Sequence, residues 1–171
     1  MVTLYNVVSA DGYIADKNGN EDFIPDSYWP YSLNVLKEYD CILMGRKTYD
    51  AIQNYGEELT KSFEDLPVRK VVVTRDKNFH PKNGYEIVHT PEDIINSNLN
   101  IVVTSGPSLN NYLLQKKLVD KIIYHEVPEL IGSGTKPYGN VDDTVDIAKI
   151  PIAKFDCATL YGADDFGANC F

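Results

Sequence analysis

Short apolar runs bounded by polar and turn residues recur along the chain, and longer segments of helical periodicity separate the early ones. A continuous apolar run of four to eight residues is typical of a buried strand. The predicted strands are Val2–Val8, Cys41–Met44, Lys70–Thr74, Tyr85–Val88, Ile101–Thr104, Lys121–Val127, Asp146–Ile152 and Ala153–Leu160. The predicted helices are Ser27–Tyr39, Lys47–Gln53, Pro91–Ser97 and Pro107–Lys117, with a further helical segment around Leu59–Phe63.

Strands that alternate with helices of this length predict an α/β domain with a mostly parallel central sheet between two helical layers, a three-layer α/β/α arrangement. After Lys121 the pattern changes to strands without helices, which predicts antiparallel strands in the C-terminal part of the sheet. The 171 residues are 43% hydrophobic and show no repeat or linker, so we expect one domain over residues 1–171.

The charge of the chain excludes some classes of ligand. A net charge of −9 argues against nucleic-acid binding, which requires clustered Lys and Arg. The three cysteines and three histidines have no metal-ligand spacing, so no metal site is expected. No membrane span or basic leader is apparent, and the odd cysteine count fits a reducing compartment, so we expect a cytoplasmic protein.

A candidate anion site follows the apolar run at residues 40–44, where Gly45, Arg46, Lys47 and Thr48 open a predicted helix. A helix N-terminus offers unpaired backbone N–H groups and a partial positive charge, which suit phosphate. The two cations and the hydroxyl would add side-chain contacts. An ordinary strand–turn–helix with solvated Arg46 and Lys47 would have the same sequence.

Two further strand ends carry similar chemistry. Thr74 and Arg75 end one β-branched run, and Ser105-Gly106-Pro107-Ser108-Leu109 follows another and opens a helix. Each alone is equally consistent with a solvated arginine or a helix cap. Together they predict a dinucleotide with several phosphates, bound beyond the carboxyl ends of the strands. The G-x-G-x-x-G and G-x-x-x-x-G-K-[ST] patterns are absent, so neither a typical Rossmann site nor a P-loop is expected.

The order of these motifs resembles the dihydrofolate reductase-like superfamily, in particular the C-terminal reductase domain of the bifunctional riboflavin-biosynthesis deaminase-reductase. The elements that carry the resemblance are, in order, Val8–Ala15, Met44–Tyr49, Val73–Arg75, Ser105–Leu109, Val119–Lys121 and Pro128–Gly134. The resemblance implies a dihydrofolate reductase-like fold and an NADPH-binding reductase. In the riboflavin reductases a glutamate precedes the pyrophosphate segment where this chain has Thr104, and the zinc deaminase half has no counterpart here.

The resemblance also implies roles for particular residues. Gly45, Arg46, Lys47 and Thr48 would hold phosphates, including the adenosine 2′-phosphate, and Thr74 and Arg75 would flank the adenosine. The pyrophosphate would lie against Ser105, Gly106, Pro107, Ser108 and Leu109. The loop that contains Ser9, Asp11 and Gly12 would border the nicotinamide and the substrate. Family habit and the strand-rich C-terminal third suggest a homodimer.

Hydride transfer also requires a proton source, and two carboxylates are candidates. Asp26 precedes the first helix, near the position from which dihydrofolate reductases present a carboxylate, but it could equally be a helix cap. Asp11 could be a turn residue before Gly12. Trp29 could stack on a planar substrate or pack in the core.

The leading hypothesis is an NADPH-dependent reductase that transfers hydride to a small planar heterocycle of the pterin, folate or aminopyrimidine type. The first alternative is a nucleotide-binding sensor or interaction module on the same fold without turnover. The second is a flavodoxin-like protein that binds FMN.

Overall fold

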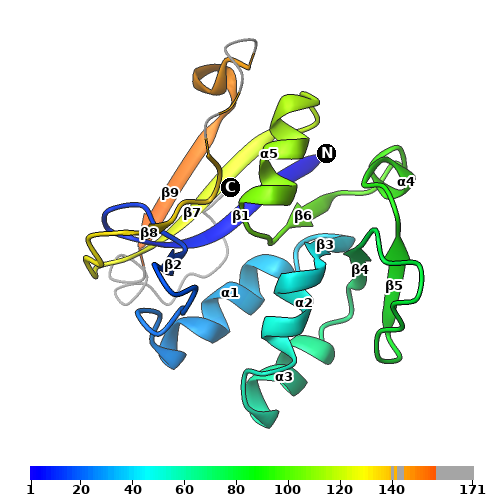
Figure 1. Ribbon diagram of the computed structural model, residues 1–171, viewed down its shortest axis with the longest axis horizontal. Helices are drawn as coiled ribbons and strands as arrows, with labels where there is room; N and C mark the ends of the chain where they lie inside the picture. The colour runs from blue at the N-terminus through cyan, green and yellow to red at the C-terminus, as the bar shows by residue number, and fades with distance from the viewer. Residues whose placement is uncertain (140, 142–144, 157–171) are drawn as a thin grey trace.

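The computed structural model describes residues 1–139, 141 and 145–156. Within these residues seven strands form one sheet in the order β5-β4-β3-β6-β1-β7-β9, and every neighbouring pair is parallel (Figure 1). The strands of this sheet are β1 (Val2–Ser9), β3 (Cys41–Gly45), β4 (Arg69–Val73), β5 (Tyr85–Val88), β6 (Ile101–Val103), β7 (Lys121–Val127) and β9 (Ile152–Asp156). A separate antiparallel pair consists of β2 (Ala15–Asp16) and β8 (Gly134–Thr135).

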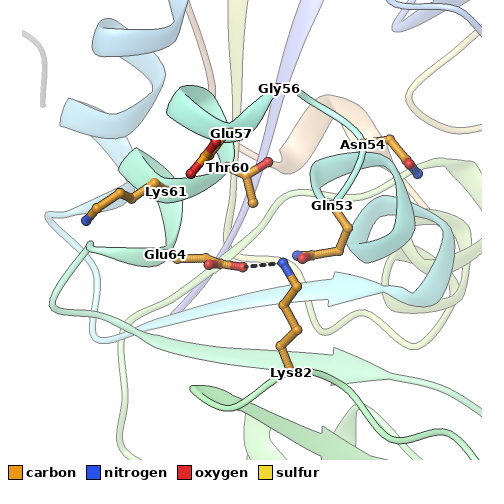
Figure 2. Close-up of a pocket in the computed structure, with 8 residues that line it drawn as sticks. All are labelled: Gln53, Asn54, Gly56, Glu57, Thr60, Lys61, Glu64 and Lys82. Atoms are coloured by element: carbon orange, nitrogen blue, oxygen red, sulfur yellow. Dashed lines mark ion pairs between the residues drawn. The ribbon is translucent and has the colours of Figure 1, made fainter.

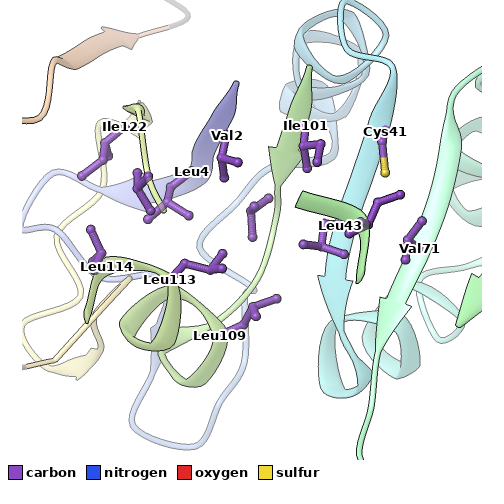
Figure 3. Packing of buried hydrophobic residues seen from close by; sticks show 13 residues of the cluster. Val2, Leu4, Cys41, Leu43, Val71, Ile101, Leu109, Leu113, Leu114 and Ile122 are labelled. Carbon is purple, nitrogen blue, oxygen red and sulfur yellow. The ribbon is translucent and has the colours of Figure 1, made fainter. Parts of the chain in front are cut away.

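Helices cover both faces of the sheet, and each face has its own hydrophobic cluster. The described helices are α1 (Trp29–Leu36), α2 (Arg46–Ile52), α3 (Glu57–Glu64), α4 (Glu92–Ile95) and α5 (Pro107–Gln115), with short 3-10 turns at Asp26–Tyr28 and Ile147–Lys149. One cluster joins the sheet to α4 through Ile94. The same cluster joins the sheet to α5 through Leu113 and Leu114 (Figure 3). The other joins it to α1, α2 and α3 through Leu36 and Phe63, among others.

The strand sequences explain this burial. Cys41 and Leu43 belong to the first cluster, whereas Ile42 and Met44 belong to the second, and all four side chains are fully buried. Successive side chains of a strand point to opposite faces, so a strand covered on both sides must be apolar throughout. The three-layer α/β/α prediction is therefore confirmed.

Two predictions about the C-terminal part of the chain are wrong for the described residues. Strand β9 pairs with β7 in parallel rather than antiparallel, and β2–β8 is the one antiparallel pair described. The predicted strand Asp146–Ile152 contains a 3-10 turn at Ile147–Lys149. Alternating apolar residues do not reveal strand direction, which depends on how the connection crosses the sheet. The predicted strand Ala153–Leu160 is described only as far as Asp156.

The connections leave the sheet toward opposite faces around β6. The chain passes from β1 to α1 and from β3 to α2 on one face, and from β6 to α5 on the other. Because β6 lies between β3 and β1, the connection after β6 and the connections after its two neighbours lead to opposite faces of the sheet. Ligands of open α/β sheets bind in such crevices, at the carboxyl ends of the strands.

Candidate functional site

The ends of β3 and β6 are joined at the centre of this edge. The backbone N–H of Gly45 donates to Ser105 Oγ at 3.2 Å. A Cβ atom at Gly45 would lie 3.1 Å from the same oxygen, so a glycine allows this close approach. The structure thus brings together two of the predicted cofactor segments, and the Ser105 side chain links them.

Two buried side-chain amides donate hydrogen bonds to the Ser105 carbonyl. Asn6 Nδ2 donates to this carbonyl oxygen at 2.8 Å, and Asn110 Nδ2 donates to it at 3.0 Å. Asn110 Nδ2 also lies 2.8 Å from the Pro137 carbonyl and 3.1 Å from Asn6 Oδ1. The side chain of Asn110 therefore ties β1, the β6–α5 turn and the segment around Pro137 to one another. The sequence pattern on α5 did not single out this residue.

The start of α5 has space and donors for an anion. Helix α5 has no side-chain N-cap, and a Cβ atom built on Gly106 would meet no atom within 4 Å. Ser108 is exposed, whereas Leu109 is 9% exposed and packs in the core. The backbone N–H groups and the Ser108 hydroxyl thus fit a phosphate, and Leu109 could contribute only its backbone.

Arg46, at the start of α2, is already held by two neighbours. Its Nε atom lies 2.8 Å from each carboxylate oxygen of Asp50, and its guanidinium carbon lies 3.8 Å from the centre of the Phe79 ring. Lys47 is exposed and Thr48 is partly buried. The predicted phosphate ligands do lie at the carboxyl end of β3, but the charge of Arg46 is partly balanced.

Thr74 and Arg75 lie at the end of β4, next to the end of β5. Thr74 Oγ1 accepts from the Asp76 backbone N–H at 3.1 Å, and the Thr74 carbonyl lies 2.8 Å from His89 Nδ1. Thr74 is buried, so it shapes the turn, and exposed Arg75 is the group available to a ligand. The Glu92 hydrogen bond is the main cause that raises the pKa of Tyr112 on α5, and the charge of Arg75 lowers it.

The loop after β1 is fastened to the loop after β7 by Asp11. Its carboxylate accepts from the Ser9 hydroxyl at 2.7 Å and from the backbone N–H groups of Gly132 and Ile131 at 2.7 and 3.3 Å. The Ser9 hydrogen bond is the main cause that lowers the pKa of Asp11, and the two amides add to it. A carboxylate stabilised in its ionised form is poorly suited to donate a proton. Gly12 has a φ of 82°, as this turn requires.

A second buried polar group lies between β1, β7 and α1. The Tyr5 hydroxyl lies 3.0 Å from Ser32 Oγ and 3.0 Å from His125 Nδ1, and His125 is fully buried. The Tyr28 ring packs 5.3 Å from the His125 ring between centroids. No sequence pattern connects Tyr5 with His125, because the two residues are 120 positions apart. A buried imidazole and phenol in contact form a candidate proton-transfer pair.

Asp26 lies in the turn before α1, and Trp29 is the first residue of that helix. Asp26 is exposed, makes no N-cap hydrogen bond, and borders a pocket of about 430 Å³ formed mainly by residues 54–59. Trp29 donates from Nε1 to Ser62 Oγ at 2.7 Å and packs edge-on against Tyr55. Trp29 therefore links α1 to α3, and its contact with a substrate stays a prediction.

Another pocket lies on the α2–α3 side of the molecule, at Gln53, Thr60 and Glu64. It has a volume of about 600 Å³ and is lined mainly by polar side chains, with Lys82 and Glu64 3.6 Å apart across it (Figure 2). The predicted cofactor residues do not line it.

Within the described residues, no helix is long and apolar enough to cross a membrane, and no three His, Cys, Asp or Glu side chains form a metal-binding group.

No family model matches the sequence. The curated protein "Riboflavin biosynthesis protein RibD" of Buchnera aphidicola subsp. Baizongia pistaciae (strain Bp) is 28% identical over 65 residues. These residues are 38% of this chain and 18% of that protein, so the match spans less than a fifth of the relative's length.

Solved structures resemble the chain over most of its length. A structure assigned to riboflavin biosynthesis from Shewanella sp. PV-4 has a TM-score of 0.63 at 22% identity, over 83% of this chain and 85% of its own. The diaminohydroxyphosphoribosylaminopyrimidine deaminase/5-amino-6-(5-phosphoribosylamino)uracil reductase of Thermotoga maritima scores 0.60 at 15% identity, over 85% of this chain and 50% of its own.

Dihydrofolate reductase from Enterococcus faecalis, complexed with NADP(H) and RAB-propyl, has a TM-score of 0.59 at 16% identity. The likeness covers 84% of this chain and 80% of that one. At these identities the comparisons show the fold. The chain has a dihydrofolate reductase-like fold, and the resemblance predicted from the order of the motifs is confirmed at that level.

Proposed function

We propose that this protein is an NADPH-dependent reductase acting on a small planar heterocycle. The observation that carries the proposal is the convergence of three anion-suited segments on one edge of a parallel sheet. Two of them, at Gly45 and Ser105, are hydrogen-bonded to each other. The third ends at Arg75, at the carboxyl end of the neighbouring strand β4.

The order of the strands sets the direction in which the cofactor would lie. Arg75 follows β4 and Arg46 follows β3, so the adenosine and its phosphate would occupy that side. The pyrophosphate would lie at the starts of α2 and α5, on either side of the crevice at β6. Because neighbouring strands are about 4.8 Å apart, an extended dinucleotide would place its nicotinamide beyond β6, at the next two strands, β1 and β7.

The substrate would then meet the nicotinamide beside β1, β7 and α1. NADPH supplies the hydride when it is bound. The β1 loop and the loop around Gly132, fastened by Asp11, would exclude water from this end of the site. Ser9 and Gly12 would border the substrate as parts of that loop.

Two groups are proposed as proton sources on the substrate side. Asp26 is the candidate from the sequence, and its 3-10 turn also contains Tyr28, which packs on His125. The Tyr5–His125 pair is the candidate from the structure, because it is buried between the two strands. Asp26 precedes α1, whereas Tyr5 contacts Ser32 within it, so single substitutions can separate their contributions.

A pterin, folate or aminopyrimidine is the substrate class we propose. It is supported by the fold shared with a dihydrofolate reductase and with a pyrimidine reductase. Thr104 stands where the resemblance places a glutamate in the riboflavin reductases. We therefore expect an aminopyrimidine substrate to be recognised differently here.

The test is a titration of the purified protein with NADPH and NADH, followed by a panel of folates, pterins and aminopyrimidines monitored by loss of NADPH absorbance. A charge-assisted phosphate contact is worth about 1.5–3 kcal/mol, so Arg75→Ala should weaken NADPH binding by about tenfold or more. NADH, which lacks the 2′-phosphate, should be affected less.

Binding of neither nucleotide would contradict the proposal. Tight NADPH binding without turnover of any panel member would favour the sensor on the same fold. The cytoplasmic location and the homodimer stay predictions, and a monomer mass in light scattering would dismiss the latter.

A further inference from the structure

The carboxylate of Asp50 lies beside the cation that would receive the adenosine 2′-phosphate. Arg46 Nε lies 2.8 Å from both oxygens of Asp50, and the two side chains are 41% and 46% exposed. Because both groups are accessible, a ligand that reaches Arg46 must also come close to Asp50.

The guanidinium of Arg46 is held in one orientation. One of its faces lies on Phe79, with the guanidinium carbon 3.8 Å from the ring centre. Phe79 is itself buried and packs edge-on against Tyr49, with centroids 5.3 Å apart. The Nε edge faces Asp50, so a ligand would meet the opposite face and the terminal amino groups of Arg46.

A carboxylate at this place acts on the two nicotinamide cofactors in opposite directions. It can accept a hydrogen bond from a ribose 2′-hydroxyl, as the acidic residue of NAD-binding sites does. A 2′-phosphate would be repelled by Asp50 while it is attracted by Arg46. The positive charge that favours NADPH is thus partly cancelled by the neighbouring negative charge.

We propose that Asp50 is a specificity-determining residue, which narrows the preference of this site for NADPH over NADH. The inference rests on the proposed function, because it concerns the adenosine end of that cofactor site. The wild-type protein would bind both nucleotides, with a modest preference for NADPH that Arg46 creates and Asp50 limits.

The test is the ratio of NADH to NADPH dissociation constants for the wild type and for Asp50→Asn, measured by fluorescence titration at low and high salt. The substitution keeps the size of the side chain and removes its charge. We expect the ratio to rise about three- to tenfold in favour of NADPH, because exposed charges a few ångströms apart interact weakly in water. The increase should shrink as salt is added.

Asp65→Asn is the matched control. Asp65 pairs with Lys61 at the same i,i+4 spacing at the end of α3, and the side chains of Asp65 and Lys61 are 62% and 69% exposed. The substitution removes the same charge as Asp50→Asn. Its ratio should stay at the wild-type value. Phe79→Leu should lower the ratio, because the guanidinium would lose the ring that orients it.

The possible failures point to different conclusions. If the wild type binds neither nucleotide, the proposed function and this inference both fail. If both nucleotides bind and Asp50→Asn matches Asp65→Asn, this inference is overturned and the proposed function stands. A loss of NADPH affinity in Asp50→Asn would overturn it as well, because Asp50 would then serve to orient Arg46.

Discussion

Asn110 offers the sharpest test of how the centre of the site is held. Its fully buried Nδ2 lies within 3.1 Å of the Ser105 carbonyl, the Pro137 carbonyl and Asn6 Oδ1. Asn110→Leu keeps the branching at Cγ, but it adds volume and leaves the Pro137 carbonyl and Asn6 Oδ1 without this donor, while the Ser105 carbonyl keeps the donor from Asn6. A buried polar group that loses its partner costs roughly 1–3 kcal/mol.

One effect reduces the expected loss. The Oδ1 atom of Asn110 is buried and has no hydrogen-bond partner among the described residues, so leucine also removes an unsatisfied acceptor. We therefore expect Asn110→Leu to lower the free energy of unfolding by about 1–2 kcal/mol, a sizeable share of a typical total of about 5–15 kcal/mol.

Urea unfolding followed by circular dichroism measures this change, with Asn111→Leu as the control on the same helix. Asn111 is partly exposed and accepts one backbone hydrogen bond, from Gly139 at 2.9 Å. Its substitution should change the free energy of unfolding by no more than about 1 kcal/mol. Equal effects of the two substitutions would refute the stabilising role of the Asn110 hydrogen bonds at the Ser105 turn.

Three further predictions concern single residues. Gly106→Ala should leave the thermal unfolding temperature unchanged, because its Cβ meets no atom within 4 Å, yet weaken NADPH binding roughly tenfold in a titration, since that space would hold the phosphate. Asp11→Asn should destabilise the protein at pH 7 by urea unfolding. Because the folded-state pKa of Asp11 is lowered, the stability it adds is present above its ordinary pKa of 3.8 and is lost as the pH falls further, so the two proteins should converge in acid. Asp26→Asn and Tyr5→Phe should be compared for turnover and NADPH affinity, and the proton source is the one whose loss lowers turnover alone; unchanged turnover in both would dismiss both.

The sheet was largely predictable because its central strands, such as β3 and β6, are buried on both faces. Such strands are apolar throughout, and glycine or a polar turn ends each of them, as at Gly45. The direction of β9 was not predictable, because parallel and antiparallel strands have similar side-chain patterns. The 3-10 turn at Ile147–Lys149 had the same apolar content as a strand.

The site was predictable only where its residues follow a strand directly. Gly45 and Ser105 were identified because parallel strand ends share one edge of the sheet. The residues that orient Arg46 and partly balance its charge do not follow a strand directly: Asp50 lies one turn along α2, and Phe79 lies in the segment after β4. A pairing between distant residues leaves no local pattern in a single sequence.

The central claim is that three strand ends hold one dinucleotide, and amide hydrogen exchange with and without NADPH tests it most directly. The account predicts slower exchange at residues 45–48, 74–75 and 105–108 together, with the same dependence on NADPH concentration. Exchange that NADPH leaves unchanged at all three segments, or slows only at residues 53–64 around the α2–α3 pocket, would contradict it.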